Sequence, residues 1–286
     1  MAIQQITIVG TGLIGGSLGL ALRHAGFMGR IVGCDKRPVL DAAQARGAID
    51  CVEADVARAI VDSDVVVLAT PVGYILSQLE LIAHLANPDT LITDTGSTKQ
   101  LFVERARALF GDAAKHRVLP GHPMAGKEVG GIENADADLF REAVWLITPV
   151  EAGQHYTARQ QEYLDLIGMI GARVIALDAE RHDRLCAWIS HLPQMIATAL
   201  ASSLREQFGD DEALTLIGGR ALREMTRIAH SPYSMWRDIA LTNTGNIEDA
   251  LLRFEQQVAH LRENLRGPGL REMFQSANQW PGSSRR

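Results

Sequence analysis

The chain has 286 residues, 47% of them hydrophobic and 22% charged, so it is long enough to bury the core of one large domain or of two. This composition excludes a disordered chain, a collagen-like fibre and a disulfide scaffold. The net charge of −6, with no long basic run, argues against a nucleic-acid partner, because binding to phosphates needs clustered lysine and arginine.

The cysteines and the N-terminus indicate a cytoplasmic protein. Cys34, Cys51 and Cys186 are far apart and lack C-x-x-C spacing, which favours a reducing compartment and argues against a structural zinc site. No basic region precedes the first apolar run, so we expect no signal peptide. Residues 185–204 carry no charged side chain, but a histidine, a proline and a glutamine among them favour a helix buried in protein over a membrane span.

The first half of the chain alternates apolar, β-branched runs with helical patterns. Strands are predicted at residues 3–9, 31–35, 65–69, 91–94, 117–119, 145–148 and 173–177. Helices are predicted at residues 14–25, 38–46, 74–85 and 98–110. Because the strand runs are continuously apolar, we expect a mostly parallel, Rossmann-like sheet with both faces covered.

Beyond residue 178 only helical periodicity is found. Helices are predicted at residues 179–206, 212–228, 234–239 and 247–266, and the segment 267–286, rich in Gly, Ser and Pro, is expected to fray. The fold class is therefore α/β followed by all-α, with a nucleotide-binding domain at 1–178 and a helical domain for dimerisation and substrate binding at 179–286.

A dinucleotide-binding motif lies where the first strand meets the first helix. Residues 10–15 read G-T-G-L-I-G, and an acidic residue follows twenty positions later, at the end of the second strand. The glycines permit a tight turn, close approach of a diphosphate and close packing of helix on strand, while the free N–H groups of the helix bind the diphosphate. The residues expected to bind the cofactor are Gly10, Gly12, Leu13, Ile14, Gly15, Asp35, Thr70 and Pro71.

Two of these positions leave alternatives open. Asp35 favours NAD over NADP, because its carboxylate accepts hydrogen bonds from ribose hydroxyls and repels a 2′-phosphate, although the adjacent Lys36 and Arg37 could pair with such a phosphate. Thr70 and Pro71 follow a buried strand at the sheet edge where ligands bind, but a turn that ends the strand explains them equally well.

Two later segments have the residues that alcohol oxidation needs. Residues 93–99 (TDTGSTK) follow a strand and open a helix, which Ser97 or Thr98 could cap. Residues 121–128 (GHPMAGKE) are interpreted as a loop at the carboxyl edge of the sheet, which makes His122 a better candidate for a general base than a histidine on a helix face.

At these residues the sequence resembles the prephenate/arogenate (cyclohexadienyl) dehydrogenase family of tyrosine biosynthesis. The resemblance covers nearly the whole chain. Its motifs are VGTGLIGGS (9–17), DTGSTK (94–99), GHPMAGKE (121–128), SHLP (190–193) and TRIAHSPYSMWRD (226–238). The glycine motif occurs in many enzymes, but the later motifs in this order are far more specific.

The resemblance implies an NAD-dependent oxidative decarboxylation and roles for eight residues. It implies that His122 takes the proton of the ring C4 hydroxyl, that Ser97 orients this hydroxyl and the histidine, and that Arg227 binds a substrate carboxylate. Further residues in or around the substrate pocket are His191, Gln194, Glu128, Trp236 and Asp183. Family members that prefer prephenate often have histidine where Gln194 stands. This neutral amide therefore does not rank prephenate against arogenate, and it could equally pack within its helix.

The family's helical domain implies a homodimer with the active site between the domains, and the uncharged 185–204 run agrees with an obligate interface. The face with Trp188 and Met195 is expected in the core. The alternative enzymes, a β-hydroxyacid dehydrogenase or an imine reductase, share this layout, but residues 179–286 contain no lysine to match the catalytic lysine usual in the former. The remaining alternative is a non-catalytic NAD-binding regulator.

Overall fold

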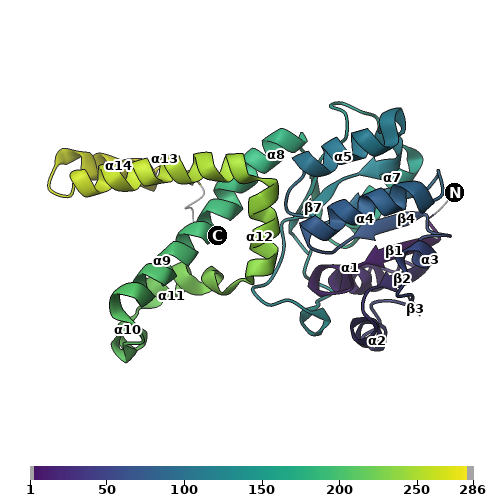
Figure 1. Cartoon of the computed structure of the whole chain (residues 1–286), viewed down its shortest axis with the longest axis horizontal. Helices are drawn as coiled ribbons and strands as arrows, with labels where there is room; N and C mark the ends of the chain where they lie inside the picture. The colour runs from purple at the N-terminus through teal and green to yellow at the C-terminus, as the bar shows by residue number, and fades with distance from the viewer. Residues whose placement is uncertain (1–2, 282–286) are drawn as a thin grey trace.

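The computed structural model describes residues 3–281, which form a sheet-containing domain and a helical domain that projects from one side of it (Figure 1). Six parallel strands form the main sheet in the order β3-β2-β1-β4-β5-β6. The strands are β1 Gln5–Val9, β2 Arg30–Cys34, β3 Cys51–Val52, β4 Val65–Leu68, β5 Leu91–Asp94 and β6 Val118–Leu119. This sheet confirms the predicted Rossmann-like fold.

Helices cover both faces of the sheet, as the continuous apolar strands predict. They are α1 Leu13–His24, α2 Arg37–Ala45, α3 Val56–Ala59, α4 Val72–Leu85, α5 Gln100–Phe110 and α6 Ala114–Arg117, with a 3-10 turn η1 at Gly111–Ala113. Side chains of α1 and α2 join the apolar cluster on one face, and those of α3, α4 and α5 join the cluster on the other. All four residues of the central strand β4 are buried.

A second, three-stranded sheet lies beside the first. It consists of β7 Gly121–Pro123, β8 Val144–Ile147 and β9 Arg173–Ala176, and is accompanied by the 3-10 turn η2 Ile132–Asn134 and helix α7 Ala158–Met169. The interpretation of residues 121–128 as a loop is therefore wrong for the first three. Gly121–Pro123 pair antiparallel with β8, and this pairing depends on a tertiary neighbour that a three-residue run flanked by glycine and proline does not reveal.

The predicted elements also do not include helix α7, although its start carries a local signal. Thr157 accepts a hydrogen bond from the backbone N–H of Gln160, and the Gln160 side chain accepts one from the N–H of Thr157. This reciprocal capping box satisfies two of the helix's free donors.

The helical domain is more broken than its periodicity predicts. Its elements are α8 Ala179–Cys186, the π-helical turn η3 Ala187–His191, α9 Leu192–Phe208, α10 Glu212–Ile217, α11 Arg220–Thr226, the 3-10 turn η4 Arg227–His230, α12 Tyr233–Thr242, α13 Thr244–Glu263 and α14 Pro268–Asn278. Pro193 lacks an N–H, so the helix widens into a π-helical turn just before it. Gly218 and Gly219 separate α10 from α11.

The expectation that residues 267–286 fray is wrong for most of this segment. Residues 268–278 form helix α14, whose Pro268 lies in its first turn, where a missing N–H costs nothing, and whose interior contains strong helix formers such as Leu270, Glu272 and Met273. Residues 282–286 lie outside the described part of the chain.

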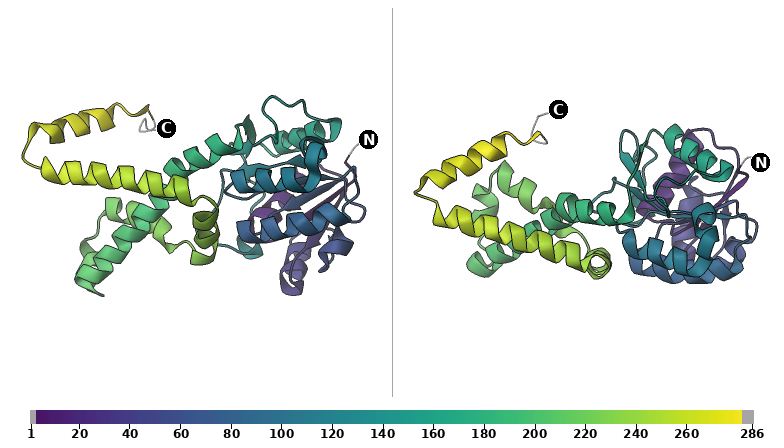
Figure 2. Two further views of the ribbon diagram at one scale, coloured as in Figure 1. Left: turned by 45° about the horizontal axis from the view of Figure 1, so that its top comes forward. Right: turned by 90° about the horizontal axis from the view of Figure 1, so that it is seen from above.

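The helices of the second domain spread apart and extend away from the sheets (Figure 2). In the described chain their buried apolar cluster contains only Ala187, Leu192, Ile239, Ile247 and Ala250. Trp188 is 40% exposed, so the prediction that it lies in the core is wrong for a single chain, whereas Met195 packs against this cluster. No helix within residues 3–281 is long and apolar enough to cross a bilayer.

Helix α12 connects the two domains by lying against α4 (Figure 1). The backbone N–H of Gly73, in the first turn of α4, donates to Asp238 Oδ2 on α12 at 3.0 Å. Thr242, at the end of α12, forms a hydroxyl–hydroxyl contact of 2.8 Å with Thr98. These contacts hold the helical domain over the carboxyl edge of the main sheet.

Candidate active site

The glycine motif forms a tight turn between β1 and α1. Gly10 has a φ of +95°, and a Cβ there would lie 2.6 Å from the carbonyl oxygen of Ala69. A Cβ on Gly15 would overlap the carbonyl oxygen of Gly10, whereas one on Gly12 would meet only open space. Only glycine therefore fits the first and third positions, and the middle position leaves room for a ligand.

The start of α1 is suited to an anion. Gly12 is the N-cap residue and offers no side-chain acceptor, so the first N–H groups of the helix remain free. Leu13 and Ile14 form the half-buried first turn. These residues fit the diphosphate of a dinucleotide.

Asp35 lies at the end of β2, next to this turn. Its carboxylate accepts hydrogen bonds from the backbone N–H of Thr11 at 2.8 Å and of Lys36 at 2.7 Å, which hold it in place. Arg37 forms an ion pair with Asp41 one helical turn further on, at 2.9 Å, while the Lys36 side chain is exposed. The fixed carboxylate fits a ribose diol.

Thr70 and Pro71 follow β4 on the other side of the glycine turn. The Thr70 methyl group is next to Gly10, and its buried hydroxyl has no hydrogen-bond partner in the described chain. Pro71 is exposed and occupies the N-cap position of α4. A buried hydroxyl without a partner fits a ligand contact better than a simple turn does.

His122 lies on β7 and is part of a line of three buried side chains. Its Nδ1 lies 2.9 Å from Nε2 of His182, and Nδ1 of His182 lies 2.7 Å from Oδ1 of Asp183. A carboxylate only accepts, so Nδ1 of His182 carries the hydrogen and Nε2 accepts one. His122 must then donate from Nδ1, and its Nε2 keeps a lone pair. This arrangement produces the tautomer that a general base requires.

Asp183 also caps α5 from the helical domain. Its carboxylate accepts the backbone N–H groups of Lys99 at 2.7 Å and of Gln100 at 2.9 Å. The expectation that Ser97 or Thr98 caps this helix is therefore wrong. Thr98 contacts Thr242 instead, and the half-buried Ser97 has no hydrogen-bond partner among residues 3–281.

A buried ion pair lies next to β7, the strand that carries His122. Lys99 pairs with Asp94, whose carboxylate also accepts the N–H of Gly96 at 2.8 Å and of Gly121 at 3.2 Å. Burial lowers the pKa of His122 well below its usual 6.5, and coulombic interactions with His182, Lys99 and His191 lower it further, because a second positive charge beside these groups is unfavourable. His122 is therefore neutral near pH 7.

Two N–H groups nearby are buried and unpaired in the described structure. Asn243 donates to Nδ1 of His191 at 3.2 Å, so the imidazole hydrogen sits on Nε2, which has no partner. Nε1 of Trp236 also lacks one, and the two rings meet edge to face with their centroids 5.9 Å apart. Burial lowers the pKa of His191 to about 4, so it is neutral. Two adjacent unsatisfied donors fit an anionic ligand.

Arg227, Glu128 and Gln194 have partners within the chain. Arg227 on η4 forms an ion pair with Glu128, which lies in the segment after β7, so this pair joins the two domains. Gln194 is buried on α9 and donates to the hydroxyl of Thr198 at 3.3 Å, one turn further along.

Sequence reasoning missed the residues that support His122. His182, Lys99, Asp94 and Asn243 are buried and joined by hydrogen bonds to the site, but none was predicted. Asp94 and Lys99 lie inside the DTGSTK motif, and two polar residues, His182 and Asp183, are buried at the start of an otherwise solvent-facing helix.

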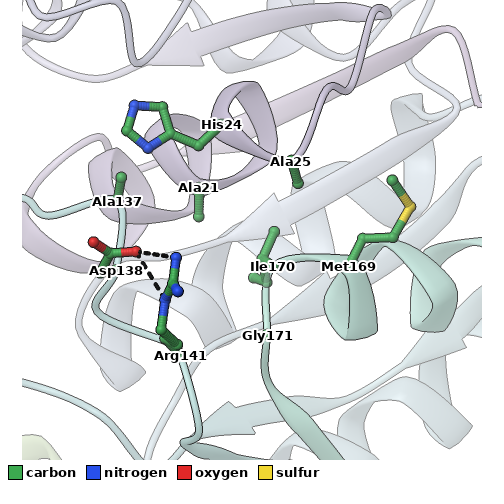
Figure 3. Close-up of a pocket in the computed structure, with 9 residues that line it drawn as sticks. All are labelled: Ala21, His24, Ala25, Ala137, Asp138, Arg141, Met169, Ile170 and Gly171. Carbon is green, nitrogen blue, oxygen red and sulfur yellow. Dashed lines mark hydrogen bonds and ion pairs between the residues drawn. The ribbon is translucent and has the colours of Figure 1, made fainter.

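A separate surface pocket of about 260 Å³ lies between α1 and α7 (Figure 3). It is lined by His24, Met169 and Ile170, with an ion pair between Asp138 and Arg141 at its edge. None of the predicted site residues lines it, so it is not part of the candidate active site.

A glycine-rich dinucleotide turn, a fixed acidic residue and a buried neutral histidine beneath a helical domain define a two-domain, NAD-dependent dehydrogenase. Residues 18–176 match the family described as "Prephenate dehydrogenase, nucleotide-binding domain", and residues 178–277 match "Prephenate dehydrogenase, dimerization domain". The chain belongs to the prephenate dehydrogenase family.

Known relatives agree with this assignment. The chain is 33% identical to the prephenate dehydrogenase of Lactococcus lactis over 261 residues, which cover 91% of this chain and 70% of that protein. A crystal structure of Aquifex aeolicus prephenate dehydrogenase with hydroxyphenyl propionate and NAD⁺ is similar with a TM-score of 0.86 and 30% identity, over 98% of this chain and 96% of that one. Synechocystis arogenate dehydrogenase is similar with a TM-score of 0.76 and 27% identity, over 96% and 97%.

Proposed function

We propose that this protein catalyses the NAD-dependent oxidative decarboxylation of prephenate, arogenate or both, to 4-hydroxyphenylpyruvate, tyrosine or both, in tyrosine biosynthesis. The observation that carries this proposal is the Asp183–His182–His122 line of hydrogen bonds, which leaves Nε2 of His122 as a proton acceptor. The relatives named for prephenate and arogenate support the substrate class.

His122 is the general base for the ring hydroxyl. NAD⁺, when bound at the glycine turn, supplies the hydride acceptor. His122 Nε2 takes the hydroxyl proton as the C4 carbon loses its hydride, and CO₂ then leaves with its bonding electrons remaining on the ring. The ring becomes aromatic with a negative charge on the former hydroxyl oxygen, and His122 returns the proton there, so the base is regenerated in each turnover.

His182 and Asp183 act as positioning residues, because His182 contacts His122 and Asp183 contacts His182. Asp183 keeps the hydrogen of His182 on Nδ1, and His182 keeps that of His122 on Nδ1. This assigns Asp183 to the support of the pocket rather than to its surface. Ser97, half-buried and without a hydrogen-bond partner in residues 3–281, is the hydroxyl that orients the bound substrate hydroxyl and, through it, His122.

The substrate carboxylates meet the donors of the helical domain. Prephenate is a dianion, so it needs more than one cationic or N–H partner. When the substrate binds, Arg227 leaves its ion pair with Glu128 and pairs with one substrate carboxylate. The unpaired N–H groups of His191 and Trp236 accommodate a second anionic group. Glu128 then lies at the rim, and Gln194 supports the pocket from its helix.

Absorbance at 340 nm tests the proposal directly. The full chain is incubated with NAD⁺ and prephenate, then with NAD⁺ and arogenate, and CO₂ release is measured alongside NADH. We expect NADH and CO₂ in equal amounts with at least one substrate. NADH without CO₂ from a β-hydroxyacid would support the alternative enzyme class, and NAD⁺ binding without turnover of any substrate would support a regulator.

NADP⁺ in place of NAD⁺ tests the role of Asp35. The fixed carboxylate repels a 2′-phosphate, so we expect kcat/KM to fall at least about 100-fold with NADP⁺. Equal use of the two cofactors would contradict this role.

We further propose a cytoplasmic homodimer with a domain boundary at residue 178. The match of residues 178–277 to a dimerization domain and the exposed apolar side chains of the helical domain support the dimer. Asp178 caps α8 through the N–H of Arg181 at 2.7 Å, which supports the boundary. Three free cysteines support a reducing compartment. A monomer in sedimentation at micromolar concentration would contradict the dimer.

A further inference from the structure

We propose that His122, His182 and Cys186 form a binding site for a thiophilic divalent metal ion of the Zn²⁺ class, and that occupation of this site blocks the base. Nδ1 of His122 and Nε2 of His182 are 2.9 Å apart, and Sγ of Cys186 lies 3.6 Å from the latter and 4.0 Å from the former. The three potential ligand atoms lie within 4.8 Å of one another.

These separations fit tetrahedral zinc. With Zn–N of about 2.0 Å and Zn–S of about 2.3 Å, tetrahedral geometry places two nitrogens about 3.3 Å apart and nitrogen about 3.5 Å from sulfur. The observed distances differ from these values by roughly half an ångström or less, which small rotations of the side chains would correct. The fourth position remains for water.

The arrangement of α8 and its neighbours favours a metal further. His182 and Cys186 are four residues apart on α8, so they project from one helix face, and β7 brings His122 opposite them. Nδ1 of His182 donates to the carboxylate of Asp183 at 2.7 Å, which leaves Nε2 as the ligand atom. Such a carboxylate–histidine pair typically orients and strengthens a metal-binding imidazole.

Metal binding changes the protons of two ligands. The Cys186 thiol releases its proton to solvent on forming a bond to the metal, and His122 must move its hydrogen from Nδ1 to Nε2. The metal-bound His122 then carries N–H where the substrate hydroxyl needs an acceptor. The inhibitory consequence rests on the proposed function, because it requires His122 to be the base, whereas the metal site itself does not.

The burial of the three ligands determines how a metal ion can reach them. His122 is 8% exposed and the other two are fully buried, so a metal ion enters past His122, from the substrate side.

Titration of the full, metal-stripped chain with Co²⁺ and Zn²⁺ tests the site. We expect one Co²⁺ per chain, with visible bands of tetrahedral cobalt and a thiolate charge-transfer band, and we expect Zn²⁺ to displace it. Cys186→Ser, and separately Cys186→Ala, should abolish the thiolate band and weaken Zn²⁺ binding at least about 100-fold. Cys51→Ser, which removes a half-buried cysteine of the other domain, is the matched control and should behave as wild type.

Inhibition of turnover by Zn²⁺ is measured independently of metal binding. Zn²⁺ should inhibit the wild type and the Cys51→Ser variant, prephenate should compete with it, and both Cys186 variants should turn over within about threefold of the wild type but resist Zn²⁺. Equal Zn²⁺ binding by the wild type and the Cys186 variants, or cobalt spectra without a thiolate band, would overturn the metal site. A cobalt site in a chain that oxidises neither prephenate nor arogenate would instead overturn the proposed function.

Discussion

The two domains differ in how they are held together. The nucleotide-binding domain buries apolar side chains on both faces of its sheet, whereas the helical domain, within residues 3–281 of one chain, has a small buried cluster and several exposed apolar residues. Yet the helical domain supplies Asp183, which caps α5, and His182, which contacts and orients His122. The nucleotide-binding domain is therefore stabilised by its own core, whereas the helical domain places residues in the site and leaves much of its apolar surface exposed, as the proposed homodimer requires.

The largest loss of activity is expected when the proposed base, His122 of the nucleotide-binding domain, is replaced. His122→Asn keeps a polar side chain on β7 but cannot take a proton, so we expect kcat to fall about 10³-fold or more. The affinity for NAD⁺, measured by fluorescence titration, should stay unchanged because the glycine turn that binds the cofactor does not include His122. Turnover near that of the wild type would refute the role of His122.

A charge on the exposed face of the helical domain should break the dimer. Leu252 on α13 is 55% exposed in the single chain, so Leu252→Asp would bury a carboxylate in the proposed interface and raise the dimer dissociation constant about 100-fold. Met28→Asp, at a 92% exposed apolar residue of the other domain, is the control. Sedimentation measures the dimer dissociation constant of both variants, and equal values would contradict an interface at α13.

Removal of the cation that joins the domains should affect substrate binding. Arg227→Ala loses a charge-assisted contact worth about 1.5–3 kcal/mol, so we expect KM for prephenate to rise roughly 10- to 100-fold with a small change in kcat. Steady-state kinetics measure this. Glu128→Gln is the informative partner variant, because it frees Arg227 without removing the guanidinium. An unchanged KM in Arg227→Ala would count against the assignment.

The pH dependence follows from the lowered pKa of His122. The neutral form is the base, so kcat/KM should be constant near neutrality and fall about tenfold per pH unit only below the lowered pKa, on the acid side of 6.5. Burial and coulombic interactions with His182, Lys99 and His191 lower this pKa. An acid limb centred above 6.5 would contradict the buried arrangement.

The smallest effect concerns one contact between the domains. Thr242 donates to the carbonyl of Asp238 at 2.8 Å, so Thr98 donates to Thr242. Thr98→Val should lower the free energy of unfolding by about 1 kcal/mol in urea titrations and leave KM for NAD⁺ unchanged. A decrease in the free energy of unfolding above about 3 kcal/mol would contradict the assignment of this contact as a single hydrogen bond between two hydroxyls.

Much of the nucleotide-binding domain could be predicted because its signals are local. Continuous apolar runs predict buried parallel strands, and β5 agrees residue for residue with its prediction at 91–94. The glycine motif and Asp35 depend on a strand, a turn and a helix that follow one another in the chain. Strand β7 could not be predicted, since its three residues have no strand pattern until β8 lies beside them.

The support of the site depended on residues that are far apart in the sequence. Local rules pointed to Ser97 or Thr98 as the cap of α5, but Asp183, 84 positions from Lys99, is the acceptor. A side chain caps a helix from any distance once the fold brings it there, and nothing in residues 97–100 records which one will. The same holds for His182, whose contact with His122 spans 60 positions.

The sequence by itself determined the class of this protein: its alternating domain, its helical domain, the dinucleotide motif, the motifs of the prephenate dehydrogenase family and the candidate base. The tertiary structure alone decided the tautomer of that base, the cap on α5, the π-helical turn before Pro193 and the grouping of His122 with His182 and Cys186. The physical reason is that motifs report local backbone needs, whereas protonation and hydrogen bonding of a buried side chain depend on the neighbours that folding supplies.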